Sequence, residues 1–429
     1  RLSVMLNADY KIKPWLKVGV TANFANYTSK MISDGSGGTS YVSMIATVFT
    51  LAPYIADTYS PSALPKPMEA LIANGFTLLR NPNGDYYSCM GTMEQVHPMV
   101  AIRTADKKNT GNSLMGTLYG NFTPFKNFTF TTRLGYRIAN DNTYVHNNLY
   151  YGSASASNKD RNGVTRTNTS TNYYQWENFA NYNATLAEKH NLSAMLGMSY
   201  SQSDITYVSA GVDKIAKDDN LYADVNFPAG DAVKSVNGIN NIYRKLSYFG
   251  RLSYDYKNRY IAQFSMRADA ADSSILPENN RWGYFPSFSG AWRISEEEFM
   301  ESTHDWLSSL KIRASWGMLG NQDALNKSNP WENQYYPWMQ TYNLDGNYPM
   351  GGNLTTGYYQ KAYRIEDLSW EKSTTWGIGL DAVINHVTFT FDYYDRKTTD
   401  IIMEVPVPTE FGLDPYFDNV GSMRNRGVE

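Results

Sequence analysis

The sequence predicts an all-β protein, an antiparallel up-and-down transmembrane β-barrel of which about twelve strands and the start of a thirteenth are present. Three observations lead to this prediction. Apolar and polar residues alternate along many segments, and successive side chains of a strand point to opposite faces. The polar positions of these segments repeatedly carry full charges. Short and long connections between the segments alternate strictly along the chain.

The composition of the 429 residues favours strands and excludes several classes of protein. The chain has 34 Tyr, 18 Phe and 10 Trp, residues that suit pleated strands. Its formal net charge of −3 argues against a nucleic-acid-binding protein, because such surfaces are ordinarily basic. The single Cys89 cannot form an internal disulfide, and no Cys/His spacing suggests a structural zinc site.

No stretch of the sequence has the length of a transmembrane helix, which needs about 20 apolar residues. The nearest candidate, Tyr41–Ala56, is shorter and is interrupted by Pro53, so we expect a helix buried in a long loop. A β-barrel crosses a bilayer with strands of about 9–11 residues. The hydropathy of the chain is therefore compatible with a membrane protein.

The alternation is clearest in Phe128–Ile138. Phe128, Phe130 and Leu134 share one face of this expected strand, whereas Arg133 and Arg137 share the other. The same pattern recurs along the chain. The other clear segments are Leu16–Phe24, Leu192–Tyr200, Leu246–Tyr256, Tyr260–Arg267, Leu310–Gly317 and Val387–Tyr393.

The connections between the expected strands fall into two classes. Every second connection is short, and the link between the ninth and tenth strands, in which Ser295 precedes Glu298 with capping-box spacing, predicts one helical turn. The intervening connections are long: Ser29–Asn112, Asn140–Asn172, Ser203–Lys245, Ala268–Arg281 and Leu319–Leu368. In an up-and-down sheet every second connection lies at the same end, so all the long loops are expected on one rim, as in transmembrane barrels.

A single strand does not decide which face is the inside. In a soluble sandwich the apolar face would be the core, whereas in a membrane barrel it contacts lipid and the charged face lines the lumen. About twelve consecutive strands with all long loops on one rim favour the barrel, and a soluble sandwich array is the alternative. The barrel interpretation turns these residues toward the lumen: Arg133, Arg137, Arg251, Arg267, Lys311, Arg313 and Asp392.

Tyr and Trp residues near strand ends fit girdles at the two membrane interfaces. For any one of them, ordinary cross-strand packing is an equally good interpretation. The candidates are Trp15, Tyr136, Tyr256, Tyr260 and Trp316.

No pattern typical of an enzyme is present. The five histidines lie in different loops or turns, without an HExxH motif or a Ser-His-Asp grouping. The acidic run Glu296–Glu298 suits the start of a short helix better than a metal site. We therefore expect no catalysis, no metal and no cofactor.

The loop Leu319–Leu368 differs from the others because it is rich in Trp and Tyr among Asn and Gln. Aromatic faces with amide neighbours suit sugar rings or peptide backbones. The alternative is that these rings form a small core of the loop itself. The candidate ligand-binding residues are Trp331, Tyr335, Tyr336, Trp338, Tyr342 and Tyr348.

Several segments resemble the SusC/RagA family of TonB-dependent outer-membrane transporters. The segments are Lys257–Met300, Trp306–Gln322, Leu368–Asp381, Phe391–Pro408 and Asn419–Glu429. Their order and spacing also match the family, so the resemblance is specific from about Lys245 onward and looser before it.

The resemblance implies a 22-stranded barrel whose lumen holds an N-terminal plug. Residues 1–429 would then be the central part of one barrel domain, with the plug and the closing strands absent. The implied function is TonB-dependent import of a large nutrient, an oligosaccharide or otherwise a peptide, across the bacterial outer membrane. The implied partners are a SusD-like surface lipoprotein, the TonB inner-membrane complex and outer-membrane lipid, with no nucleic acid. A non-transporting barrel that acts as a signalling receptor or adhesion scaffold is the alternative.

The motif residues that carry the resemblance lie at expected strand–loop boundaries. We expect them to be architectural, because Gly permits close backbone approach and Arg can bridge carbonyls or carboxylates on the lumen side. They are Asn279, Asn280, Arg281, Trp282, Gly283, Asn419, Gly421, Arg424, Asn425, Arg426 and Gly427.

Overall fold

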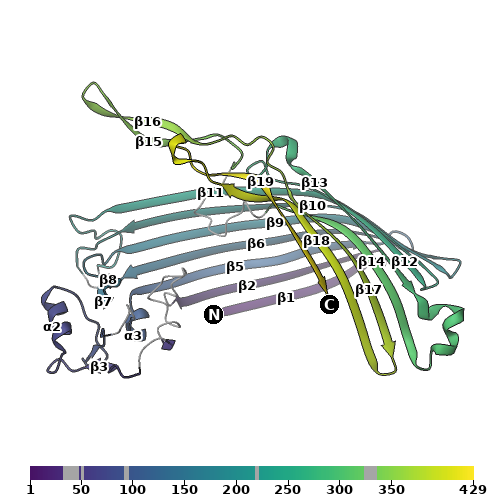
Figure 1. The fold of residues 1–429 in the computed structure, drawn as a ribbon, viewed down its shortest axis with the longest axis horizontal. Helices are drawn as coiled ribbons and strands as arrows, with labels where there is room; N and C mark the ends of the chain where they lie inside the picture. Colours follow the sequence, from purple (N-terminus) through teal and green to yellow (C-terminus); the bar gives the residue numbers. More distant parts are fainter. Residues whose placement is uncertain (32–47, 50–52, 91–95, 218–221, 323–335) are drawn as a thin grey trace.

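Thirteen strands form one antiparallel sheet in the computed structural model, which describes residues 1–31, 48–49, 53–90, 96–217, 222–322 and 336–429. The strands pair in sequence order, and β1 and β19 are the two free edges of this sheet, so the barrel is not closed. Figure 1 shows the strong curvature of the sheet. The strands are β1 (Leu2–Lys13), β2 (Leu16–Met31), β5 (Ala105–Phe122), β6 (Phe128–Asn147), β9 (Val164–Leu186), β10 (His190–Val212), β11 (Lys234–Tyr256), β12 (Tyr260–Ala270), β13 (Trp282–Arg293), β14 (Leu307–Asn321), β17 (Glu371–Ile384), β18 (Val387–Val405) and β19 (Tyr416–Val428). The predicted partial up-and-down barrel is confirmed.

The remaining elements belong to the connections. They are β3 (Thr58–Tyr59), α2 (Lys66–Ala73), β4 (Tyr86–Tyr87), α3 (Pro98–Ala101), β7 (Tyr150–Ser153), β8 (Ala156–Asn158), η1 (Glu278–Asn280), η2 (Ile294–Glu296), η3 (Glu298–Thr303), β15 (Thr341–Met350), β16 (Asn353–Ala362) and η5 (Thr409–Phe411). Among the described residues no helix is both long and apolar enough to cross a bilayer. Most of Tyr41–Ala56, where a helix was expected, lies outside the described residues.

The two rims of the sheet differ as predicted. Tight hairpins close one rim: Ala187 and Glu188 have φ of 48° and 55°, and Lys257 and Asn258 have φ of 54° and 58°. Two successive left-handed residues are the geometry of a type I′ turn, whose twist matches that of the flanking strands. We call this end the turn rim. The long connections lie at the opposite end, which we call the loop rim.

Several strands are longer than the sequence predicted. The expected loop Asn140–Asn172 is mostly strand, because β6 continues to Asn147 and β9 begins at Val164. β9, β10 and β11 have 23 residues each, and the pairing register of β9 with β10 is continuous over that length. Thr, Asn and Ser occupy both faces of these extensions, so the period-two hydrophobic signal vanishes although the hydrogen-bonded ladder continues.

The capping box expected at Ser295 is wrong. Ser295 lies inside η2, with Arg293 at the N-cap, and neither η2 nor η3 has a side-chain cap hydrogen bond. Instead, His304 Nε2 donates a hydrogen bond to the backbone carbonyl oxygen of the buried Ser295, at 2.7 Å. Two short 3₁₀ turns therefore replace the single helical turn, and the hydrogen bond between His304 and Ser295 links the end of the second turn to the first.

The two faces of the sheet have opposite character. On the apolar face, Leu196 is 72% exposed, whereas on the polar face Ser247 is 1% and Asp269 is 5% exposed. No second sheet covers the apolar face within the described ranges, where the other sheets have two strands each. The sandwich alternative is therefore wrong, since a sandwich buries its apolar face between two sheets.

Tyr and Trp rings of the apolar face make contacts at two levels, with the Phe264–Phe288 pair, at 4.7 Å, between them. Near the turn rim, Tyr260 stacks between Tyr256 and Trp292, with ring centroids 6.4 and 6.3 Å away. Nearer the loop rim, Tyr248 stacks on Trp282 at 6.1 Å, and Trp376 contacts Tyr393 at 5.4 Å. This arrangement is typical of the aromatic girdles of membrane barrels.

Candidate functional site

The polar face carries ion pairs that link neighbouring strands. Arg133 Nε lies 2.9 Å from Glu177 Oε2, and Lys311 Nζ lies 2.8 Å from Asp381 Oδ2. Each pair joins residues that are directly opposite in the strand register. Arg133 and Lys311 are therefore neutralised by carboxylates on adjacent strands, and each ion pair links two neighbouring strands of the polar face.

Gly379 lets side chains of two non-adjacent strands meet on the polar face. Arg313 on β14 and Asp392 on β18 both face Gly379 of β17, and Arg313 Nη2 donates to Asp392 Oδ2 at 2.6 Å. A Cβ at Gly379 would lie 2.6 Å from Arg313 Cζ and 2.7 Å from Asp392 Oδ1. Glycine is required here because only a missing side chain leaves room for the ion pair.

A contact between non-adjacent strands across a glycine also occurs twice among the first strands of the sheet. The Tyr119 hydroxyl reaches Asp9 over Gly19, and the Tyr27 hydroxyl reaches Asp141 over Gly111. In both cases a Cβ on the glycine would collide with the interacting atoms. Glycine-bridged contacts thus tie strands together at three separate places along the polar face.

The hollows along the polar face of the described sheet include ones of about 330, 800 and 960 Å³. Lys311, Arg313 and Asp392 line the first, Arg251 and Arg267 line the second, and Arg137 lines the third. Together with Arg133, these are the seven residues that the sequence placed on one face. The strand register puts all seven on the polar face.

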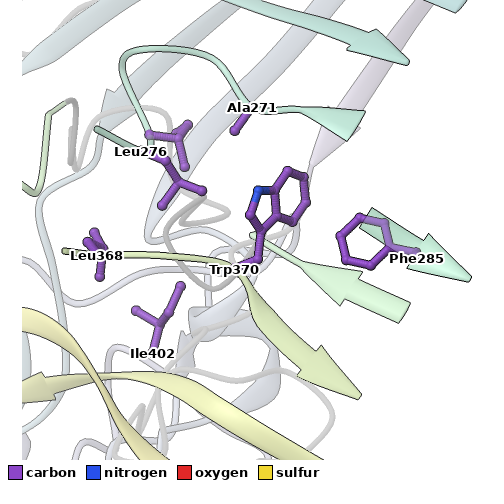
Figure 2. Packing of buried hydrophobic residues seen from close by; sticks show 7 residues of the cluster. Ala271, Leu276, Phe285, Leu368, Trp370 and Ile402 are labelled. Atoms are coloured by element: carbon purple, nitrogen blue, oxygen red, sulfur yellow. The ribbon is translucent and has the colours of Figure 1, made fainter. Parts of the chain in front are cut away.

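A hydrophobic cluster, which we call the loop-rim core, joins the loops at the other end of the sheet. Figure 2 shows Trp370 among Leu276, Phe285 and Ile402, and its ring meets Phe285 at 5.4 Å. Trp370 Nε1 donates to the carbonyl of Arg281 at 2.9 Å. The buried members of this core are Ala271, Ile275, Leu276, Phe285, Leu368, Trp370 and Ile402. Residues from four separate connections or strand ends therefore share one core.

Two asparagines of the family motif bind backbone groups around the loop-rim core. Asn280 Nδ2 donates to the carbonyl of Asp367 at 2.9 Å. Asn419 accepts from the Ser369 amide at 2.7 Å and donates to the carbonyls of Ser369 and Asp400, at 3.0 and 2.7 Å. Each side chain fixes the distance between two segments that are far apart in the sequence.

Two buried carboxylates with similar contacts were missed by the sequence analysis. Glu371 accepts from the Ile402 amide at 2.9 Å and from Asn321 Nδ2 at 2.6 Å. Asp272 accepts from the amides of Arg244 and Ser274, both at 2.8 Å. Their position at a strand–loop boundary was a usable signal, because an acidic side chain there can bind free backbone amides.

The other motif residues lie on both faces of the sheet. Trp282 is on the apolar face, whereas Gly427 leaves room for the Tyr394 ring on the polar face, where a Cβ would approach the hydroxyl to 2.6 Å. A Cβ on Gly283 would collide with Phe285, and one on Gly421 would lie 3.0 Å from Ile401 Cβ. Asn279 belongs to η1, and Asn425 is opposite Arg396 in the register.

Arg424 and Arg426 lie on the apolar face, and the lumen side expected for motif arginines is wrong for them. Arg426 is opposite Asp395 in the register, and Asp395 is opposite Trp376. Trp376 shares its face with Trp316 and Phe288. The alternation of Arg and Asn in β19 contains no apolar residue that could mark the face, so the sequence pattern was not informative.

The four aromatic candidates that the structure describes lie in two places, with Tyr336 and Trp338 in ring contact at 6.1 Å and the other two on the β15–β16 hairpin. Trp338 packs against the loop-rim core and donates from Nε1 to the carbonyl of Ser273 at 3.1 Å. Tyr342 and Tyr348 lie on the β15–β16 hairpin and are 54% and 66% exposed. Tyr336, 41% exposed, precedes the hairpin. Trp331 and Tyr335 lie outside the described residues.

A carboxylate anchors the aromatic residues at the turn rim. Glu297, between η2 and η3, accepts from the Tyr260 hydroxyl at 2.5 Å, from Trp292 Nε1 at 3.0 Å and from Arg259 Nη1 at 3.1 Å. The hydrogen bonds from Tyr260 and then Trp292 hold the pKa of the Glu297 carboxyl below its ordinary value. The cluster is therefore ionised at neutral pH and loses its contribution as the pH falls through the lowered pKa.

Comparison with known proteins agrees with the sheet and its two faces. The family described as "TonB dependent receptor-like, beta-barrel" matches residues 74–429. TonB-dependent receptor SusC of Bacteroides thetaiotaomicron is 39% identical over 188 residues, 43% of this chain and 18% of that protein. TonB-dependent receptor P3 of Formosa agariphila is 26% identical over 442 residues, all of this chain and 39% of that protein.

The fold is also that of a solved transporter. The structure titled "Structure of the RagAB peptide transporter" matches with a TM-score of 0.73 and 24% identity, over 99% of this chain and 43% of that chain. The chain thus spans less than half the length of these relatives. We conclude that it belongs to the TonB-dependent receptor β-barrel family of the bacterial outer membrane and is similar to SusC and to the RagAB transporter.

Proposed function

We propose that this chain forms the central wall of an importer that carries a large nutrient across the outer membrane, driven by TonB. The observation that carries the proposal is the inverted sheet: a polar face with ion pairs and hollows, opposite an apolar face with exposed side chains. A wall with these two faces suits a barrel whose polar face lines a water-filled lumen and whose apolar face contacts lipid. The seven charged residues predicted from the sequence would then face this lumen.

We take residues 1–429 as the central part of one barrel domain of a longer protein. The matched relatives are more than twice as long as the chain, which supports this assignment. A plug and further strands would come from the rest of the protein. A SusD-like lipoprotein at the loop rim and the TonB complex below the plug are the partners that the family suggests.

We propose an oligosaccharide as cargo, with a peptide as the second candidate. Exposed rings on the β15–β16 hairpin support contact with either class, because aromatic faces bind sugar rings and peptide backbones alike. One matched structure is titled a peptide transporter, and the name of the relative SusC states no cargo. Both an oligosaccharide and a peptide therefore remain candidate cargoes.

The proposal is tested by growth of a strain that lacks the full-length gene. On a panel of single glycans and peptides, we expect loss of growth on one class and rescue by the intact gene. Rescue must fail when the TonB system is inactivated. Equal growth of the deletion strain on every nutrient, with the protein normally expressed in the parent, would contradict import as the function.

A further inference from the structure

The connection between β13 and β14 is attached to the outside of the sheet. Glu297, between the two 3₁₀ turns of this connection, accepts from the Tyr260 hydroxyl at 2.5 Å and from Trp292 Nε1 at 3.0 Å. Tyr260 and Trp292 are opposite each other in the register and belong to the apolar face. Residues 294–306, which we call the foot, are therefore held against the apolar face at the turn rim.

Hydrogen bonding and packing give the foot a defined shape. His304 Nε2 donates to the carbonyl oxygen of Ser295 at 2.7 Å and so links the two 3₁₀ turns. The first turn, η2, packs against the start of β14. There Leu307 is opposite Ile384 on the apolar face and is only 6% exposed. The foot is thus an ordered element that lies over the lower end of the apolar face.

The exposed part of the foot carries an aromatic ring among carboxylates. Phe299 belongs to η3 and is 67% exposed. The side chain of Glu298 is 87% exposed, and Glu301 is exposed as well. Segments that lie in a membrane interface combine an apolar surface with charged neighbours in this way. Because the charged neighbours here are acidic, attraction to a bilayer has to come from the ring.

The foot lies at the height of the lower aromatic level. Tyr256, Tyr260 and Trp292 stack on one another near the turn rim, and Tyr and Trp rings of membrane proteins place their polar tips among the headgroups. Glu297 binds two of these tips and therefore shares their height. Phe299 follows two residues later, so the Cα atoms of the two residues are at most about 7 Å apart. The headgroup layer is itself about 5–8 Å thick, so the Phe299 ring is within reach of the acyl chains.

A second turn-rim connection also carries a ring on the outside. Phe125 lies between β5 and β6 and is 59% exposed, and its ring stacks on Phe128 at 4.9 Å. Phe128 begins β6 on the apolar face. The free edges β1 and β19 are at least two strands away from both connections. Outward rings at the turn rim are therefore a property of the interior of the sheet and not of its open ends.

We propose that the foot lies in the periplasmic interface of the outer membrane, with the Phe299 ring against the acyl chains of the periplasmic leaflet and Glu297 as the residue that positions it. Height, exposure and continuity with the apolar face support the bilayer as the partner. Further strands of the barrel would continue from β1 and β19, and a plug would lie in the lumen, so neither reaches the outer face between β12 and β14. The foot would fix the depth of this part of the wall in the membrane.

The test uses the full-length protein reconstituted in phospholipid bilayers, with Cys89 replaced by Ser. An environment-sensitive fluorophore is attached at Phe299→Cys and, as the matched control, at Glu301→Cys. Residues two apart in a 3₁₀ turn point to different sides, so the control samples the same turn on another side. Quenching by lipids brominated on their acyl chains reports membrane contact, and quenching by iodide reports water. We expect the ratio of lipid to iodide quenching to be several-fold higher at 299 than at 301.

The role of Glu297 is tested with the fluorophore at 299. Glu297→Ala removes the hydrogen bonds that attach the foot, so lipid quenching should fall and iodide quenching should rise. Glu298→Ala is the matched control and should leave both unchanged, because Glu298 Oε1 lies 4.0 Å from Arg259, too far for a hydrogen bond. Heat-modifiable gel mobility verifies assembly of each variant.

Three results would overturn the proposal. A quenching ratio at 299 no higher than at 301 would place the ring in water. Shielding of the fluorophore at 299 from both quenchers would mean that protein covers it. Unchanged quenching in an assembled Glu297→Ala variant would remove Glu297 as the positioning residue. The comparison of 299 with 301 leaves Glu297 intact, so it decides the membrane contact even if Glu297→Ala does not assemble.

Discussion

The connection between β14 and β17 contains two regions of similar composition and opposite character. Around the loop-rim core, Trp338 and Leu368 pack against neighbouring loops, and Leu368 is fully buried. On the β15–β16 hairpin, Tyr348 and Tyr358 are 66% and 74% exposed, and Figure 1 shows the hairpin projecting away from the curved sheet. Aromatic content alone therefore does not determine whether a loop folds onto the barrel.

The two regions differ in the hydrogen bonds that they make to neighbouring segments of the chain. Rings of the loop-rim core are accompanied by Asn280, Asn419 and Glu371, which satisfy the backbone groups of the surrounding loops. The two strands of the hairpin pair with each other, with register shifts, and at its base the Lys361 carbonyl accepts from the Asp414 amide of the β18–β19 connection at 2.8 Å. An isolated two-stranded hairpin is marginally stable in water. We infer that the loop-rim core provides rigidity, and that the hairpin is free to serve contacts outside the chain.

The largest effect is expected from Trp370→Ala. The side chain is 3% exposed, and truncation would open a cavity and remove the bond to Arg281, which should cost about 3–5 kcal/mol. Urea unfolding in detergent, followed by heat-modifiable gel mobility, measures the loss. Tyr358→Ala on the hairpin is the matched control and should change the free energy of unfolding by less than about 0.5 kcal/mol. Equal losses in both variants would abolish the distinction between the two regions.

A smaller loss is expected from Asn419→Ala. The substitution leaves the Ser369 amide and the Asp400 carbonyl without their partner, at a cost of about 1–3 kcal/mol. Asn425→Ala on the same strand is the control, because no hydrogen bond of its side chain is recorded among the described residues. Hydrogen exchange of residues 363–370 should accelerate only in the Asn419 variant. Unchanged exchange would mean that Asn419 does not hold these loops together.

The smallest effect on stability is expected from the double variant Tyr342→Ala/Tyr348→Ala. Both rings are exposed, so the free energy of unfolding should stay within about 0.5 kcal/mol. If the hairpin contacts cargo, binding should weaken by about tenfold, since two ring contacts of this kind together contribute about 1–2 kcal/mol. Isothermal titration calorimetry with the cargo identified in the growth assay measures this change in affinity. Wild-type affinity in an assembled variant would remove the hairpin from the ligand site.

The sequence predicted the wall of the barrel well because alternation is a local signal. Residues such as Phe130 and Arg133 report their faces directly, and the seven charged residues assigned to one face share it in the structure. The extensions of β9 and β10 were missed because Thr and Asn lie on both of their faces. The outward position of Arg424 was missed for a similar reason, since neither face of β19 is clearly apolar.

The loop-rim contacts depend on distances between segments far apart in the chain. The position of Glu371 at a strand–loop boundary suggests a bond to some backbone amide, but it does not indicate that the amide is that of Ile402, and nothing near Trp338 indicates its bond to Ser273. Composition correctly marked the β14–β17 connection as unusual. It could not separate the rings that build the loop-rim core from those that remain exposed, because that depends on the neighbouring loops.

The most direct test of the inverted wall compares two adjacent positions of β11 in the full-length protein reconstituted in lipid. Nitroxide spin labels are placed at Leu252→Cys on the apolar face and Ser253→Cys on the polar face, after replacing Cys89 by Ser. We predict that the label at 252 collides preferentially with oxygen dissolved in the bilayer, and the label at 253 with a water-soluble nickel complex. The opposite preference, or equal preferences at both positions, would contradict the account.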